Sequence, residues 1–140
     1  MPNLHPLVVH FPIALLTCAY FFDVLAIGRD RPKYSNVGWW MQVAGSIGLL
    51  FTLATGLQAK SSVSVPLKAV DTLQVHEQLA FVVAVLFLVL LLQRIGARSM
   101  IPERSRGLYW AAYSLGVILL WVTAWYGGGL VYDFGVGVAG

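Results

Sequence analysis

Charged residues are scarce in this sequence, and their scarcity excludes several classes of protein. Only 9 Lys and Arg and 6 Asp and Glu occur among 140 residues, which is 11% of the chain. An average globular domain is roughly 25% charged, and a small soluble domain needs a polar coat because much of its surface faces water. An ordinary soluble enzyme and a disordered chain are therefore excluded. The net charge of +3 indicates no nucleic-acid partner, since basic residues in a membrane protein set its orientation.

Cysteine and the common catalytic motifs are also missing or rare. Cys18 is the only cysteine, which excludes an internal disulfide framework, a CxxC metal site and a c-type haem attachment site. The sequence contains no GxSxG, HExxH or P-loop motif, so the common signatures of hydrolases and nucleotide-binding enzymes are lacking. We therefore expect no independent catalytic activity.

Apolar residues make up 59% of the chain, and most of them fall into four long runs. A helix that crosses a bilayer needs about 20 mostly apolar residues, and each run meets that length. Residues 1–140 are thus predicted to form one transmembrane domain, an antiparallel four-helix bundle followed by a tail over residues 127–140, and no internal repeat is apparent. The predicted helices are Val9–Ile27, Val37–Leu57, Val75–Gln93 and Leu108–Tyr126.

The basic residues predict how the bundle is oriented. Three lie in or beside the first connection and four in or beside the third, whereas the second connection has two. Because cytoplasmic loops carry the excess of Lys and Arg, both termini are predicted to face outward from a bacterial inner membrane. The residues counted are Arg29, Arg31 and Lys33, then Arg94, Arg98, Arg104 and Arg106, against Lys60 and Lys68.

Small residues and glycine predict close packing in two places. Ala44, Gly48, Thr52 and Gly56 recur every four residues, and such a stripe lets a neighbouring backbone approach. We expect this stripe to pack against another helix of the same bundle. The alternative is that it packs against a partner subunit. The glycine-rich but apolar tail is predicted to fold over the outer face.

All three histidines are predicted to lie at the outer face of the membrane. His5 and His10 precede or open the first helix, and His76 opens the third, which runs in the same direction. Diagonal helices in such a bundle lie roughly 12–14 Å apart, given 8–10 Å between neighbours, so imidazoles from both could reach one central atom. We predict a haem b site with His10 and His76 as axial ligands. His5 would be a supporting group or an alternative ligand.

Other readings of the histidines stay open at this point. His5, His10 and His76 could hold Cu or Zn together with Asp71 or Glu77, since imidazole suits both metals. The same polar groups could line a pocket for a quinone or another small molecule. The simplest alternative is that the histidines lie at headgroup level and bond to backbone or water.

Asp23 lies within the first predicted helix, about one turn from its inner end. A carboxylate in a membrane is costly unless it is paired. We predict a buried ion pair with Arg94 or Arg29. A proton-relay role is the alternative, but no second acid lies deep in any predicted helix.

Several motifs carry a resemblance to a known family. They are HPLVVHFPIALL at residues 5–16, ATG at 54–56, His76, GGGLVY at 127–132 and GVGV at 135–138. Together they resemble the bacterial four-helix membrane family known as domain of unknown function 2231. Some relatives carry Rieske or cytochrome-like domains, which implies work beside electron carriers. Phe134 stands where the family commonly has histidine, so the resemblance supports a single site at His10 and His76.

These observations lead to one functional prediction and one alternative. The chain is predicted to be a haem b-binding membrane protein or subunit that transfers electrons, with the lipid bilayer and a larger redox or membrane complex as partners. The alternative is a non-catalytic accessory subunit that packs against a larger membrane complex. The small size of the chain and its small-residue stripe are the features that favour this alternative.

Overall fold

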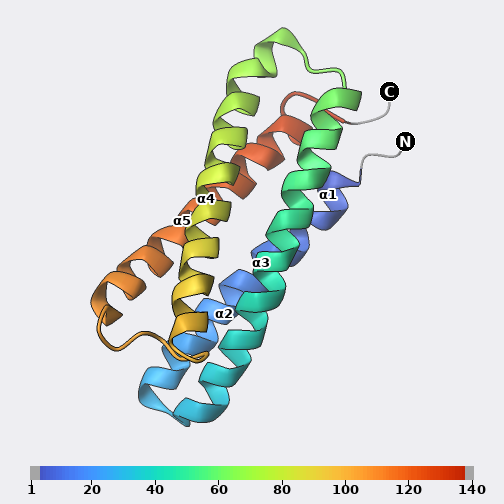
Figure 1. Ribbon diagram of the computed structural model, residues 1–140. Coiled ribbons are helices and arrows are strands. Elements are labelled where there is room, and N and C mark those ends of the chain that lie inside the picture. Colours follow the sequence, from blue (N-terminus) through green and yellow to red (C-terminus); the bar gives the residue numbers. More distant parts are fainter. Residues whose placement is uncertain (1–3, 138–140) are drawn as a thin grey trace.

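The described residues form a bundle of long helices that lie side by side (Figure 1). A computed structural model describes residues 4–137. The first and the last described residues lie at one end of the bundle, here called the terminal end, beside the connection of residues 63–69. The opposite end, called the connection end, holds residues 29–30 and 97–105. The helices are α1 (His5–Val8), α2 (His10–Gly28), α3 (Arg31–Ser62), the 3-10 turn η1 (Leu67–Ala69), α4 (Val70–Gly96) and α5 (Arg106–Tyr132).

The four predicted membrane helices are present, and the helical segments extend beyond them. Four segments are long and apolar enough to cross a membrane: His5–Gly28, Arg31–Ser62, Leu67–Gly96 and Arg106–Tyr132. Each predicted span lies inside one of these segments. The apolar run marks only the part of a helix that matches the bilayer core, whereas the helical backbone continues through more polar residues on either side.

Prolines shape the entry into the first helix. α2 begins at His10, as Pro12 predicts, because proline is tolerated in a first turn. His5 lies in a turn before this start. It opens α1, a single turn with Pro6 in its first positions. This turn is the local structure that sets the direction of the His5 side chain.

The glycine-rich tail is shorter than predicted, because α5 continues to Tyr132 and includes Gly127, Gly128 and Gly129. Beyond the end of the helix, Gly135 adopts a φ of +68°, a conformation that glycine takes without strain. Lys68 Nζ lies 6.0 Å from the centre of the Phe134 ring, so this part of the tail lies against the connection before α4. The last three tail residues, 138–140, are outside the described residues.

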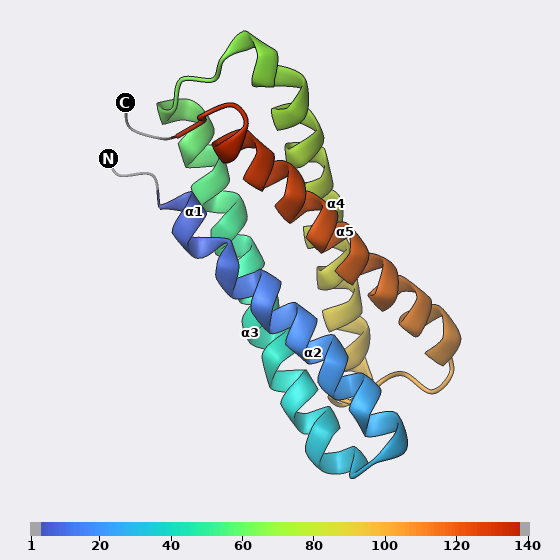
Figure 2. The same cartoon turned by 180° about the vertical axis from the view of Figure 1, so that it is seen from behind.

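The bundle consists of two helical hairpins. α2 packs along α3, and α4 packs along α5, while α3 with α4 and α2 with α5 form the seams between the hairpins (Figures 1 and 2). The core runs through the middle of both hairpins and includes Leu16, Leu49, Phe87 and Tyr113. α2 and α4 run in the same direction and occupy diagonal positions.

The two hairpins bury residues at matching positions, separated by a constant offset of 71 residues. At this offset Leu16 is equivalent to Phe87, and Asp23 is equivalent to Arg94. The same offset relates both helices of one hairpin to those of the other, with no insertion between them. The buried pairs are Pro12 and Val83, Leu16 and Phe87, Ala19 and Leu90, Asp23 and Arg94, Gly38 and Tyr109, Gln42 and Tyr113, Gly45 and Gly116, and Leu49 and Leu120.

This pattern identifies an internal repeat, which corrects the expectation that there is none. Since α2 and α4 run in the same direction, the repeats are related by an approximate two-fold axis along the bundle, the arrangement of parallel repeats in membrane proteins. The repeat is weak in sequence because most pairs share burial and not residue type. Identical pairs include His5 and His76, Gly45 and Gly116, Thr52 and Thr123, and Gly56 and Gly127.

Glycine permits the close contact of α3 with α1 and α2. A Cβ added at Gly48 would lie 3.4 Å from the Pro12 ring, and one at Gly56 would lie 3.1 Å from His5. The predicted stripe therefore packs within the bundle at these two positions. The tightest contact to an apolar side chain is at Gly45, outside that stripe, where a Cβ would lie 2.7 Å from the Leu16 side chain.

A methyl group at Gly45 should push α2 and α3 apart. Leu16 is fully buried and has no room to move, so Gly45→Ala should lower the free energy of unfolding by about 1–3 kcal/mol. The measurement is the midpoint of unfolding by a denaturing detergent. Gly107→Ala is the matched control, since this helical glycine has nothing within 4 Å of the added Cβ. Equal midpoints for both variants would show that the contact is not tight.

Candidate functional site

Two of the three histidines come together at the terminal end of the bundle. The ring centres of His5 and His76 are 6.3 Å apart, and the ring planes meet at 80°. His10 opens α2 and is exposed, next to the exposed Phe11. The predicted partner of His76 was His10, whereas the structure pairs His76 with His5. The α1 turn causes this difference, because it turns the His5 side chain toward α3 and the bundle interior.

His5 is held by the end of α3. Its Nδ1 lies 3.2 Å from Thr55 Oγ1, and the residue also forms a hydrogen bond with the backbone of Thr52. The ring lies over Gly56, where an added Cβ would be 3.1 Å from His5 Cε1. Any larger residue at position 56 would displace the ring.

His76 is held by the end of α5 in the equivalent way. Its Nδ1 lies 2.9 Å from the carbonyl oxygen of Thr123, and a carbonyl only accepts, so Nδ1 carries the proton and donates. The lone pair is then on Nε2. An added Cβ at Gly127 would lie 3.0 Å from His76 Cε1. Thr123 and Gly127 are the repeat equivalents of Thr52 and Gly56, so one anchoring pattern occurs twice.

A second polar cluster lies at the connection end. Arg94 and Asp23 are both fully buried and form a two-pronged ion pair, with Arg94 Nη1 2.6 Å from Asp23 Oδ2 and Nη2 2.8 Å from Oδ1. The prediction of a buried ion pair is confirmed, with Arg94 as the partner. The pair joins α2 to α4 and therefore one hairpin to the other.

The remaining donors of Arg94 are also used. Nε donates to the Ser99 carbonyl at 2.9 Å, Nη1 to Gln42 Oε1 at 2.9 Å, and Nη2 to the Ser35 carbonyl at 2.9 Å. Tyr109 donates to the same Gln42 oxygen at 3.3 Å. A buried charge is tolerated when its partners satisfy it, and this cluster meets that condition for the guanidinium.

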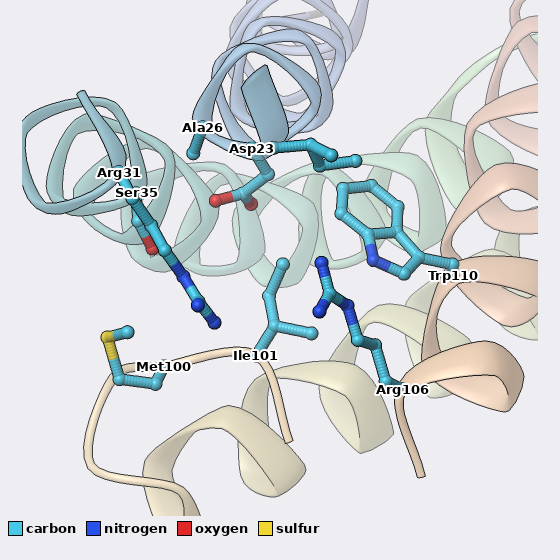
Figure 3. A pocket seen from close by; sticks show the side chains of 9 residues that line it. Asp23, Ala26, Arg31, Ser35, Met100, Ile101, Arg106 and Trp110 are labelled. Carbon is cyan, nitrogen blue, oxygen red and sulfur yellow. The ribbon is translucent and has the colours of Figure 1, made fainter. Parts of the chain in front are cut away.

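A small pocket opens beside this cluster (Figure 3). The Asp23 carboxylate and the guanidinium groups of Arg31 and Arg106 point toward it, and Trp110 forms part of its wall. Its volume is about 20 Å³, enough for about one water molecule. Arg31 donates to Glu103 at 2.8 Å, and this contact lowers the pKa of the Glu103 carboxyl, which therefore stays ionised at neutral pH. The pocket is too small for an organic ligand.

The Cu or Zn alternative lacks a third ligand in the part of the chain that the structure describes. No group of three or more His, Cys, Asp or Glu residues comes together among residues 4–137. Glu77, which was predicted as a possible ligand, forms an ion pair with Lys60 at 2.7 Å. This contact links the end of α3 to α4 beside the histidines.

The comparisons with known proteins agree with the fold. The model of the family described as "Predicted membrane protein (DUF2231)" matches residues 1–140. The chain belongs to this family. No curated protein and no solved structure matches it. The family match and the four long apolar helices support a multi-pass membrane protein.

The sequence held a signal for the His5–His76 pair that the prediction did not use. The offset of 71 residues relates His5 to His76 and also Asp23 to Arg94. His10 has Phe81 as its equivalent, so it has no repeated partner. Comparison of the two halves of the chain at a fixed offset would have selected His5 over His10.

Loss of one charge of the ion pair should lower the stability of the protein more than loss of both charges. Asp23→Asn leaves the buried Arg94 charge uncompensated and should lower the free energy of unfolding by about 3–5 kcal/mol. Adding Arg94→Gln to that variant should recover part of the loss, because no buried charge remains. The detergent unfolding midpoint measures both effects.

Glu103→Gln is the control for these variants. It removes a carboxylate from an exposed ion pair and should leave the midpoint unchanged. If the double variant were instead as unstable as the sum of its two single variants, the two charges would not be coupled.

Proposed function

We propose that this chain is a haem b-binding membrane protein that transfers electrons, with His5 and His76 as the axial ligands. The observation that carries the proposal is the pair of neighbouring imidazoles, one from each hairpin, with ring centres 6.3 Å apart and ring planes at 80°. A metal–imidazole bond of about 2.1 Å puts two ring centres on opposite sides of one metal roughly 6–6.5 Å apart. The observed separation falls in that range.

The surroundings of the two rings also suit this group. Ligating histidines usually donate their other ring nitrogen to a carbonyl or similar acceptor, which fixes the tautomer. The His76 Nδ1 contact with the Thr123 carbonyl has this form, and Thr55 contacts Nδ1 of His5. Gly56 and Gly127 present no side chain beneath the rings, so the two imidazoles pack directly against the backbones of α3 and α5.

Haem is favoured over Cu or Zn by the number of protein ligands. A porphyrin needs only two axial ligands from the chain, whereas a structural Zn site takes four ligands and a catalytic one three. The described residues offer two. When bound, the haem would supply the one-electron chemistry, and the chain would orient the imidazoles and keep water away from the site. We place the terminal end outward from a bacterial inner membrane, because the connection end has the larger number of basic residues.

The test is a reduced-minus-oxidised visible spectrum of the full chain, produced with haem available and purified in detergent. Wild type should give the sharp reduced bands of low-spin haem b. His5→Ala and His76→Ala should lose these bands. His10→Ala is the matched control, a histidine at the same end of the bundle that is exposed, and it should keep them.

Two outcomes would contradict the proposal in different ways. Loss of the bands in His10→Ala but not in His5→Ala would restore the ligand pair predicted from the sequence. Absence of bands from the wild-type protein would overturn haem binding altogether. The accessory-subunit function would then be the one to test, through the proteins that co-purify with the chain.

A further inference from the structure

Two arginines point into the small pocket at the connection end, and each one opens a helix that can cross the membrane. Arg31 is the first residue of α3, and Arg106 is the first residue of α5. α5 has 27 residues and is therefore about 40 Å long. This length matches a bilayer together with its headgroup regions. The arginine at the start of α5 thus lies at the depth of the lipid phosphates.

The charges around the pocket favour an anion. Glu103 accepts from Arg31 at 2.8 Å, and the charge of Arg106 also acts on this carboxylate. One carboxylate therefore serves two guanidinium groups. Asp23 is the acid in the pocket wall, but both its oxygens are already bonded to Arg94. The two arginines thus leave a net positive charge at the mouth of the pocket.

The contact between Arg31 and Glu103 is also one that an incoming anion can replace. Both side chains are more than half exposed. Exposed ion pairs contribute little free energy, because water competes for both partners. Binding of a phosphate to Arg31 in place of the carboxylate therefore costs little.

The internal repeat indicates that packing alone does not require these arginines. At the offset of 71 residues, Arg31 is equivalent to Pro102, and Arg106 is equivalent to Ser35. Each arginine thus has an uncharged equivalent in the other half of the chain. The pair of guanidinium groups belongs to one side of the bundle only, and binding of a ligand on that side accounts for it.

The size and the wall of the pocket indicate which anion fits. A volume of about 20 Å³ admits about one water-sized group, such as one oxygen of a phosphate whose other atoms stay outside. Guanidinium groups suit phosphate, because their N–H donors can bind two of its oxygens at once. Ile27 and Met100 form an apolar part of the wall and are 59% and 41% exposed. A phosphate that carries hydrocarbon finds both kinds of contact here.

We propose that this pocket binds the phosphate of an anionic membrane phospholipid, held between Arg31 and Arg106, with one lipid per chain. One phosphate oxygen enters the pocket, and the others accept from the two guanidinium groups in competition with Glu103. The apolar part of the lipid lies along Ile27 and Met100. Basic pockets between membrane helices bind anionic headgroups in this way. The proposal does not rest on haem binding, because the histidine pair lies at the opposite end of the bundle.

The test is a titration of the purified full chain with phosphatidylglycerol in an uncharged detergent, with bound lipid counted by native mass spectrometry. Wild type should bind one phosphatidylglycerol per chain at the lowest concentrations. Arg106→Gln should weaken this binding about tenfold, the loss expected for one hydrogen bond to a charged group. Arg104→Gln is the matched control, since it removes the same charge two residues away from a side chain outside the pocket wall. Equal losses in the two variants would overturn the proposal, because binding would then follow net charge alone.

Glu103→Gln should have the opposite effect on lipid binding. It frees Arg31 from its carboxylate partner and should tighten the binding of phosphatidylglycerol by up to about fivefold. The unfolding midpoint of this variant should stay that of wild type, as predicted above, so the change in affinity is separable from stability. Unchanged or weaker binding would overturn the proposed competition between this carboxylate and the phosphate.

Competing ligands identify the source of the phosphate. Inorganic phosphate should not displace phosphatidylglycerol, because it lacks the hydrocarbon that contacts Ile27 and Met100. Displacement at equal concentration would show a site for a soluble anion and would overturn the lipid proposal. Phosphatidylcholine, whose choline balances its phosphate, should bind more weakly, and equal binding would also overturn the proposal. His5→Ala should bind phosphatidylglycerol like wild type, so failure of lipid binding and absence of haem bands are independent results.

Discussion

The buried ion pair between Asp23 and Arg94 is the interaction on which the arrangement of the two hairpins depends. Lipid tails are as apolar as leucine, so there is no hydrophobic force to hold helices together within a bilayer. Close packing and polar contacts must replace it. α2 and α3 pack closely through glycine, but the seam between α3 and α4 contains a cavity. The contact between hairpins therefore includes polar contacts along the whole bundle. They are the ion pair at one end, the hydrogen bonds of Trp121 and Tyr20 in the α2–α5 seam, and the His5–His76 contact at the other end.

The repeat explains why one of these contacts is symmetric and the other is not. Residues on an approximate two-fold axis face their own equivalents. Two aspartates or two arginines there would repel each other in a medium of low dielectric constant, so the equivalent positions must carry opposite charges, as Asp23 and Arg94 do. Two histidines can both be neutral. The histidine pair can thus stay identical.

The sequence was sufficient for the helices and for the ion pair, but not for the partner of His76. Apolar runs of sufficient length predict spanning helices directly, and a lone carboxylate in such a run requires a nearby cation. The direction of the His5 side chain depends instead on α1, the single helical turn that precedes Val9. No length or periodicity fixes the direction of a four-residue turn. Only the repeat carries that information, and it is hidden because most equivalent positions share burial and not residue type.

The side chains at the seams show where the two repeats differ most. Trp121 and Tyr20 join the α2–α5 seam, while their equivalents in the α3–α4 seam are leucines. Larger side chains in the α3–α4 seam would pack this seam as closely as the other one. The cavity therefore means that the α3–α4 seam has fewer packing contacts. Ser46 of the cavity wall, whose hydroxyl has no partner among residues 4–137, lies on the helix that also carries Thr55 and Gly56 beneath His5. At 1.5 Å per residue, Ser46 and Gly56 are roughly 15 Å apart along α3. One helix therefore carries both the residues that support the histidine pair and a residue of the cavity wall, at a fixed separation.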